Sequence, residues 1–323
     1  MPTSIVPRRS LPALTVALAA PRPASAQSFP NRPIRIIVPA TPGGQSDIGG
    51  RALAELLREE TGQPAMVENR TGAGGQVGLE ATLRAPKDGY TLGMFGDSAV
   101  LINPLLQRNM AYSVDDMLLL TPMYTGTFAV AVNAGFPART MAEFIAEVRR
   151  RRGISYGAYG VASAPRILGE MVCMAAGIDM EIVPYRGETE AVTDLMSGTL
   201  SVFVGTTAAV REQHRAGTLR VLGVSQAERV AALPDVPTFT EQGLPGVQYR
   251  WFHGLTLQNG TPQPIVEFYS RVLPKIIGTE RFRAMIGPDV TPAPMSLDDF
   301  ATFVQRSRER VAGIIRERNL PIN

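Results

Sequence analysis

Few residues in this chain have the types and spacing that covalent catalysis or metal binding requires. The 323 residues include two histidines, His214 and His253, and a single cysteine, Cys173. One cysteine cannot form an intrachain disulfide, and no group of Cys, His and Glu has the spacing of a metal site. Cys173 lies in the apolar run 171–174, which predicts a buried structural thiol.

One segment resembles the start of a serine hydrolase motif. Gly96-Asp97-Ser98 matches a GDS-type beginning, which needs an Asp-x-x-His sequence late in the chain. Three residues before His214 stands Arg211, and three residues before His253 stands Arg250. No Gly-x-Ser-x-Gly sequence is present either. An exported hydrolase is therefore an alternative that lacks its catalytic histidine.

The glycine-rich segment Gly72–Gly78 does not match a nucleotide-binding loop. The dinucleotide-binding fingerprint is Gly-x-Gly-x-x-Gly, and its third glycine would fall on Val77. The segment also does not follow the first predicted strand, as that fingerprint requires. A phosphate-binding loop needs a lysine after its glycines, but the chain has only Lys87 and Lys275. We therefore expect no cofactor and no metal, and a protein that binds a ligand without converting it.

Composition excludes a wholly disordered chain and a general affinity for nucleic acid. Hydrophobic residues make up 45% of the chain and charged residues 19%. Arg8, Arg9 and Arg22 account for the whole net charge of +3, because the first 26 residues contain no acid. The rest of the chain is neutral, so we expect neither nucleic acid nor a membrane surface as a partner.

Residues 1–26 are predicted to be a signal peptide. Arg8 and Arg9 form a charged region, and a weakly apolar stretch follows from Leu11 to Ala20. Ala24-Ser25-Ala26 is a small-x-small cleavage site, so the mature chain would begin at Gln27 in the periplasm. The arginine pair also fits an incomplete twin-arginine motif, so that route is an alternative to Sec export. A disordered tail is the other alternative.

Short apolar runs alternate with amphipathic helical patterns along the mature chain. A helix is predicted from about Asp47 to Glu60, and two more open at Thr140 with Glu143 and at Ser296 with Asp299. Continuous apolar runs are typical of buried parallel strands, so the expected fold class is α/β with mainly parallel sheets. The predicted strands are Ile34–Val38, Ala65–Glu68, Thr91–Phe95, Phe128–Val132, Ile154–Tyr156, Glu181–Tyr185, Leu200–Val204 and Leu219–Val224.

Two segments repeat the same order of strand, loop and helix. The first strand leads into loop Ala40–Asp47, and strand Ile154–Tyr156 leads into loop Gly157–Ala164 and a helix from Pro165. Ligands of open α/β sheets bind outside the carboxyl ends of the strands. Unpaired backbone N–H groups and the helix dipole favour an anion there. The pattern predicts a clamshell receptor with two domains.

Several motifs, in order and correctly spaced, cover essentially all of the mature chain. They are Phe29–Pro39, Pro42–Asp47, Val67–Gly75, Asp88–Leu92, Ile102–Pro104, Val183–Gly187 and Ala232–Thr238. Together they closely resemble the Bug/TctC family, the periplasmic solute receptors of tripartite tricarboxylate transporters.

This resemblance implies a periplasmic-binding-protein type II fold, a clamshell of two α/β domains joined by two crossings. Domain 1 would comprise residues 27–129 and 251–323, and domain 2 residues 130–250. Proteins of the family bind small carboxylates, largely through backbone amides of two loops and ordered water. The cleft between the domains closes on the ligand.

The resemblance also implies a set of ligand-binding residues. The glycines of the first loop would let the backbone approach the ligand, whereas Asp47 would instead cap its helix. Asp97 and Ser98 fall where the family has small polar residues. The residues carried over to the site are Thr41, Gly43, Gly44, Gln45, Ser46, Asp47, Asp97, Ser98, Gly160, Val161, Ala162, Ser163, Arg166, Gly205 and Thr206.

Two positions depart from the family pattern and leave the ligand open. Arg166 stands where the family continues with serines and a histidine. It would either pair with a ligand carboxylate in the cleft or be a solvated arginine that points away from the cleft, with Glu170 near enough to compensate its charge. Gly205 replaces the family's common aspartate, which would leave the cleft less negative and favour a second carboxylate or an aromatic acid. Asp97 could instead accept an ammonium group.

The resemblance implies a receptor that binds a small carboxylate, either a di- or tricarboxylate or an aromatic acid. It would deliver this ligand to the membrane permease subunits of a tripartite tricarboxylate transporter. The alternative is an orphan receptor that presents its ligand to a sensor protein. We expect a monomer.

Overall fold

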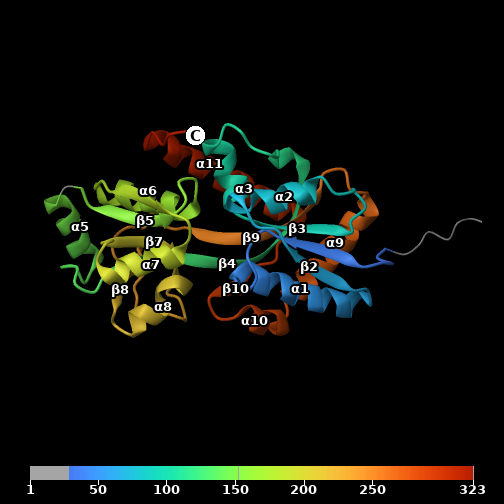
Figure 1. Cartoon of the computed structure of the whole chain (residues 1–323), viewed down its shortest axis with the longest axis horizontal. Helices are drawn as coiled ribbons and strands as arrows, with labels where there is room; N and C mark the ends of the chain where they lie inside the picture. The colour runs from blue at the N-terminus through green and yellow to red at the C-terminus, as the bar shows by residue number, and fades with distance from the viewer. Residues whose placement is uncertain (1–28, 152, 323) are drawn as a thin grey trace, which may run out of the picture.

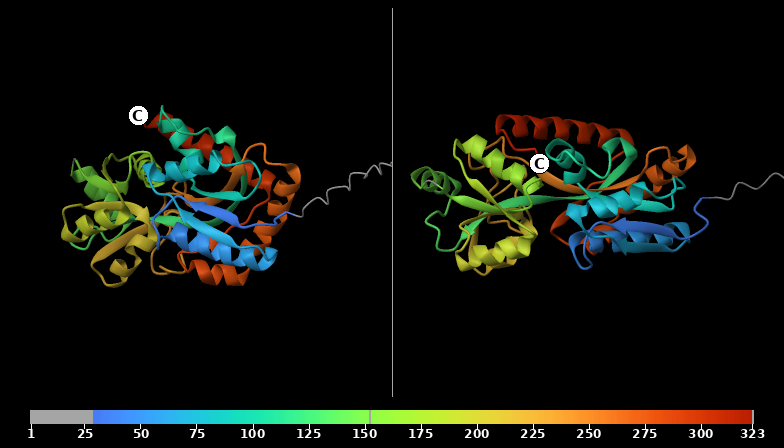
Figure 2. Two further views of the ribbon diagram at one scale, coloured as in Figure 1. Left: turned by 45° about the vertical axis from the view of Figure 1, so that its right-hand side comes forward. Right: turned by 45° about the horizontal axis from the view of Figure 1, so that its top comes forward.

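The chain forms two halves that lie side by side and share one extended sheet (Figure 1). The computed structural model describes residues 29–151 and 153–322, so the predicted signal peptide lies outside the described residues. Helices and strands alternate through both halves, which confirms the predicted α/β class. Helices cover both faces of the sheet in each half (Figure 2). None of the described helices is both long enough and apolar enough to cross a lipid bilayer.

In the first half, strands that alternate with helices pair in parallel. Ile36 of the central strand lies opposite Val67 on one side and Leu92 on the other, and it is fully buried. The elements of this part are β1 (Ile34–Val38), α1 (Gln45–Thr61), β2 (Ala65–Asn69), α2 (Gln76–Leu83), β3 (Thr91–Gly96), α3 (Ser98–Leu101) and α4 (Asn103–Leu106), with short 3₁₀ turns at Ala73–Gly75 and Val114–Asp116.

The second half repeats this arrangement. Its central strand β5 pairs in parallel with β6 and β7, and Tyr156 lies opposite both Ile182 and Val202. The elements are α5 (Met141–Arg150), β5 (Ser155–Tyr159), α6 (Ala164–Ala176), β6 (Glu181–Tyr185), α7 (Glu188–Ser197), β7 (Val202–Thr206), α8 (Thr207–Arg215) and β8 (Leu219–Val224).

Two long strands, β4 (Met117–Asn133) and β9 (Arg250–Gln258), carry the chain between the halves. β4 pairs antiparallel with β9 from Met117 to Thr127, and from Phe128 onward it pairs with β7 and β8. The change of partner falls close to the predicted domain boundaries, which stay a prediction. Only the second part of β4 was predicted from the sequence, because Thr, Pro and Gly interrupt the apolar pattern of its first part. Strand β9 was not predicted, because His, Gly and Thr interrupt its apolar pattern.

The chain ends with elements that return to the first half and then bridge both halves. They are α9 (Gln263–Ile277), α10 (Glu280–Ile286), β10 (Val290–Pro292) and α11 (Leu297–Glu317). α11 lies along both halves (Figure 2) and packs on α3, β4 and α6. Just beyond it, Arg318 donates hydrogen bonds to Glu170 at 2.8 Å and to Asp179 at 2.9 Å, both in the second half.

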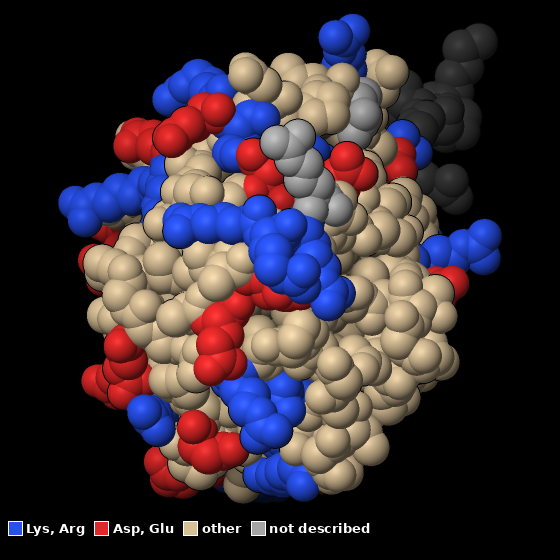
Figure 3. Space-filling view, turned by 90° about the vertical axis from the view of Figure 1, so that its left-hand side faces the viewer, with Lys and Arg blue, Asp and Glu red and all other residues tan. Residues whose placement is uncertain are grey.

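Side-chain caps explain where several helices begin. The Thr140 hydroxyl accepts a hydrogen bond from the Glu143 N–H, and the Ser296 hydroxyl accepts one from the Asp299 N–H. Both predicted helix starts are thereby confirmed. The basic run at the end of α5 is partly neutralised, because Glu147 pairs with Arg150. Figure 3 shows this end of the molecule with basic and acidic side chains lying next to one another.

A buried pair of side chains ties the end of β3 to the return crossing. The Asp97 N–H donates to Phe252 O at 3.0 Å, and the Tyr249 hydroxyl donates to Asp97 Oδ2 at 2.9 Å. Asp97 and Tyr249 are 5% and 9% exposed. Burial raises the pKa of Asp97 to about 7, although hydrogen bonds from Tyr249 and Ser98 oppose the rise.

We predict that Asp97→Asn changes how stability depends on pH. The folded chain holds a proton on Asp97 that the unfolded chain releases near its ordinary pKa of 3.8. The contribution of Asp97 to the free energy of unfolding therefore falls as pH rises from about 4 to about 7, whereas an asparagine does not titrate. The free energy of unfolding of the variant relative to the native chain should rise by roughly 2–4 kcal/mol over this interval.

Denaturant unfolding at several pH values measures this difference. Asp298→Asn is the control, because that side chain is exposed and takes part in none of the ion pairs among the described residues. A difference for Asp97→Asn that stays constant from pH 4 to pH 8 would contradict the prediction.

Candidate functional site

A cavity of about 830 Å³ lies between the two halves, at the carboxyl ends of their parallel strands. The first half contributes Gly43, Gln45 and Ser46 and residues 95–99, and the second half contributes residues 186–189 and 206–209. The crossing strand β9 supplies Trp251 and His253. Because both halves line the cavity, a ligand bound there would touch each of them.

Three helices open onto this cavity with a glycine at the N-cap and no capping side chain. They are α1 after Gly44, α2 after Gly75 and α7 after Gly187. Two helices that begin away from the cavity have capping hydroxyls, Thr140 before α5 and Ser163 before α6, whereas α8 begins at the cavity and is capped by Thr206. An uncapped N-terminus leaves backbone N–H groups and the positive end of the helix dipole for an anion.

Asp47 anchors the loop that leads into α1. Its carboxylate accepts hydrogen bonds from the Gly43 N–H, the Arg51 Nε and the Asn69 Nδ2, each at 2.9 Å. The Arg51 guanidinium is the main reason why the pKa of Asp47 falls to about 2. Asp47 is buried and does not line the cavity, as expected of a residue that holds the loop. Gly43 has φ of +84°, a conformation that favours glycine.

The floor of the cavity contains a hydrogen-bonded group that the sequence analysis did not identify. The His253 Nδ1 lies 2.8 Å from the Tyr124 hydroxyl and 3.3 Å from the Ser46 hydroxyl. Desolvation lowers the pKa of His253 to about 4, so the ring is neutral at physiological pH. Tyr124 also donates to Gln45 O at 3.1 Å, which ties β4 to the start of α1.

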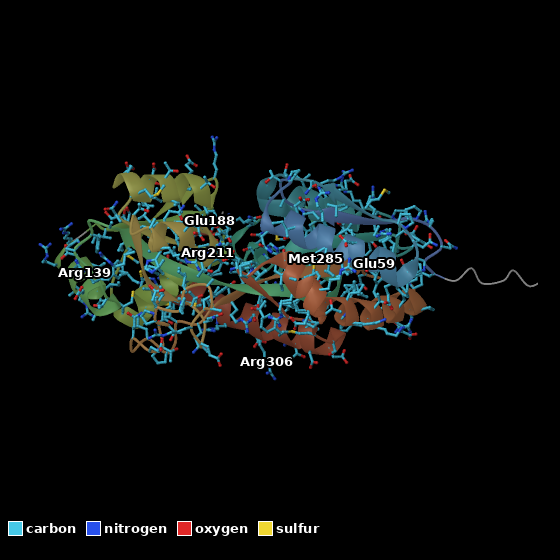
Figure 4. The ribbon with its side chains drawn as sticks, turned by 90° about the horizontal axis from the view of Figure 1, so that it is seen from below. Glu59, Arg139, Glu188, Arg211, Met285 and Arg306 are labelled. Carbon is cyan, nitrogen blue, oxygen red and sulfur yellow. The ribbon has the colours of Figure 1, made fainter. Side chains whose placement is uncertain are left out.

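Glu188, at the start of α7, is a second cavity residue that the sequence analysis missed. Its Oε1 accepts from the Thr206 N–H and its Oε2 from the Thr206 hydroxyl, both at 2.6 Å. Burial raises the pKa of Glu188, and the two hydrogen bonds from Thr206 oppose the rise. Figure 4 labels Glu188 and Arg211 on the side of the second half that faces the first. The only signal in the sequence was the polar segment 186–190 after a strand.

The structure brings six of the predicted site residues to the cavity wall. These are Gly43, Gln45, Ser46, Asp97, Ser98 and Thr206. Thr41, Gly44 and Gly205 belong to the same loops and strand end but do not line the cavity itself. Their contact with a ligand stays a prediction.

The loop before α6 and Arg166 lie outside the cavity wall. Gly160, Val161, Ala162 and Ser163 do not line it, and Ser163 caps α6 instead. The Arg166 side chain is buried, donates to Val161 O at 2.7 Å and lies 4.0 Å from Glu170. Arg166 therefore points away from the cleft, as one of its two predicted positions has it, but the prediction that it is solvated there is wrong. Only 6% of Arg166 is exposed to solvent.

An ion pair joins the two halves beside the cavity. Arg211 of α8 pairs with Asp289, which precedes β10 and lines the cavity. Arg186 is exposed and also lines the cavity. Among the residues that the structure describes, no group of three or more His, Cys, Asp or Glu side chains could hold a metal ion.

Comparison with known proteins agrees with this geometry. A family model described as the tripartite tricarboxylate transporter family receptor matches residues 50–320. Protein BugT of Bordetella pertussis is 31% identical to the chain over 307 residues, which cover 94% of each protein. A UPF0065 protein of Cupriavidus necator, from the gbd 5' region, is 30% identical and covers 98% of this chain and 97% of that protein.

Solved structures show the same fold. A structure described as a periplasmic transporter is 30% identical, with a TM-score of 0.80, over 92% of this chain and all of that one (100%). Rpa4515 of R. palustris, solved with adipate, is 25% identical with a TM-score of 0.80, over 89% of this chain and 97% of that one. Taken with the matched family model, these similarities show that the chain belongs to the Bug/TctC family of tripartite tricarboxylate transporter receptors, which are periplasmic solute-binding proteins and not enzymes.

Proposed function

We propose that this protein is a periplasmic receptor that binds a small carboxylate in the cavity between its halves and delivers it to a tripartite tricarboxylate transporter. The observation that carries the proposal is the convergence of three helix N-termini, α1, α2 and α7, on one cavity without capping side chains. Bare backbone donors and helix dipoles favour a carboxylate over a neutral solute.

The similarity to Rpa4515, whose structure contains adipate, supports a carboxylate ligand for this chain. The α1 end of the cavity supports it too, because Ser46 adds a hydroxyl donor to the backbone N–H groups there. A cavity of about 830 Å³ is large enough for a small organic acid together with ordered water. Membership of the transporter receptor family supports a permease as the partner.

We predict that carboxylates stabilise the mature chain without being converted. A thermal-shift screen of mono-, di- and tricarboxylates and aromatic acids measures this. A ligand at 100 times its dissociation constant should add about 2.7 kcal/mol to the free energy of unfolding. Neutral sugars of similar size serve as controls. Stabilisation by sugars but by no acid in the screen would contradict the proposal.

We predict that Ser46→Asp weakens binding of the best carboxylate while leaving the fold intact. A carboxylate in the first turn of α1 suits the helix dipole, but it repels an anionic ligand. Affinity should fall by roughly a hundredfold, which is about 2.7 kcal/mol. Isothermal calorimetry measures the loss.

Ser296→Asp is the matched control for Ser46→Asp. It adds the same charge at the start of α11, outside the cavity, and aspartate is also a good N-cap. Equal affinities for the native chain, Ser46→Asp and Ser296→Asp would show that the α1 end does not bind the ligand.

We predict that the exported protein begins at Gln27. Cleavage after Ala26 removes the three arginines of the first 26 residues, so the mature chain is neutral. N-terminal sequencing of the periplasmic fraction measures the start. A periplasmic protein that still carries Arg8 and Arg9 would show that the segment is not a cleaved signal peptide.

A further inference from the structure

We propose that Glu188 makes this receptor select a carboxylate that also carries an ammonium group, and discriminate against dicarboxylates. The inference rests on the proposed function, since it assumes that a carboxylate of the ligand binds at the α1 end of the cavity. It assigns the other end of the cavity to a positively charged group.

Glu188 is held in place by its own half of the protein. Both of its carboxylate oxygens accept hydrogen bonds from Thr206, one from the backbone and one from the hydroxyl. Gly205 leaves room for this arrangement, because a Cβ at that position would lie 2.7 Å from Glu188 Oε1. Residue 205 supplies no carboxyl group, but this end of the cavity still has one, because Glu188 of α7 provides it.

Glu188 has no cation of its own. None of the ion pairs among the described residues includes it, and the nearby Arg211 pairs with Asp289 and Glu212. Glu188 already accepts the Thr206 N–H, so this backbone donor at the start of α8 is not available to a ligand carboxylate. The uncapped start of α7 favours an anion at this end, but the Glu188 carboxyl group beside it opposes a second carboxylate and offers an acceptor to an ammonium group.

A second carboxyl group lies in the same part of the cavity. Asp97, Tyr159 and Glu188 all line the same cavity, Asp97 from the first half and the other two from the second. Asp97 accepts hydrogen bonds from Tyr249 and Ser98 and pairs with no cation among the described residues. Carboxyl oxygens from both halves thus contribute to the lining of this cavity.

Arg186 is the residue that could favour the opposite ligand. It lines the cavity, but it is exposed, and no ion pair with Glu188 or Asp97 is present. A ligand with two carboxylates would have to place the second one against Arg186 and away from both carboxyl groups.

The test compares ligands that differ only in one charged group. The pairs are succinate with β-alanine, glutarate with 4-aminobutyrate, and adipate with 5-aminopentanoate, each titrated by calorimetry into the mature protein. In the pair that binds best, we expect the amino acid to bind at least about tenfold more tightly than the dicarboxylate. Glu188→Gln should weaken the amino acid by at least about tenfold and leave the dicarboxylate unchanged or tighter.

Glu190→Gln is the matched control, because Glu190 is exposed on the same helix and does not line the cavity. It should leave both ligands unchanged. The ratio of affinities in the native protein tests the proposal even if Glu188→Gln does not fold.

Three results would overturn the inference. The dicarboxylate could bind more tightly than its amino counterpart, which alone would contradict the inference; loss of this preference in Arg186→Gln would assign it to Arg186. The ratio of the two affinities could be the same in the native protein and in Glu188→Gln. In both cases the proposed carboxylate receptor would stand, whereas binding of neither series, nor of any acid in the thermal-shift screen, would overturn the proposed function together with the inference.

Discussion

The antiparallel pairing of β4 with β9 is the constraint on which the rest of the structure depends. These strands are the crossings between the halves, and their register sets how the two sets of helix N-termini face each other. Gly126 permits a close approach at the centre, because a Cβ there would lie 2.2 Å from the Trp251 ring. Trp251 and His253 therefore form the floor of the cavity from the same strand that holds the halves together.

The cavity is electrostatically uneven along its length. At the α1 end, Asp47 uses its charge to hold the loop and leaves the backbone donors of Gln45 and Ser46 facing the cavity. At the other end, Glu188 occupies a backbone donor of α8. His253 is neutral at the floor and adds no charge. Backbone donors alone therefore favour an anion at the α1 end, whereas at the α7 end the Glu188 carboxyl group opposes the helix dipole.

Arg166 and Glu188 show why the site could be predicted only in part. Arg166 follows a loop that feeds a helix, so its position in the chain was compatible with the cleft, but its side chain turns toward Glu170 in the interior. Glu188 was not singled out, because its role depends on Thr206 and on the space above Gly205. Those contacts lie 17 and 18 residues away in the sequence, and no local pattern encodes them.

The sequence by itself determined the α/β class, the family, the start of α11 and strands such as Ile34–Val38, since burial and capping leave local patterns. It also determined that Gly43 to Ser46 form the loop at one end of the cavity. Only the tertiary structure decided that β4 runs through both halves, that Arg166 turns inward and that Glu188 faces the ligand space. These outcomes depend on packing between distant segments, where the available space and the hydrogen-bond partners select one arrangement.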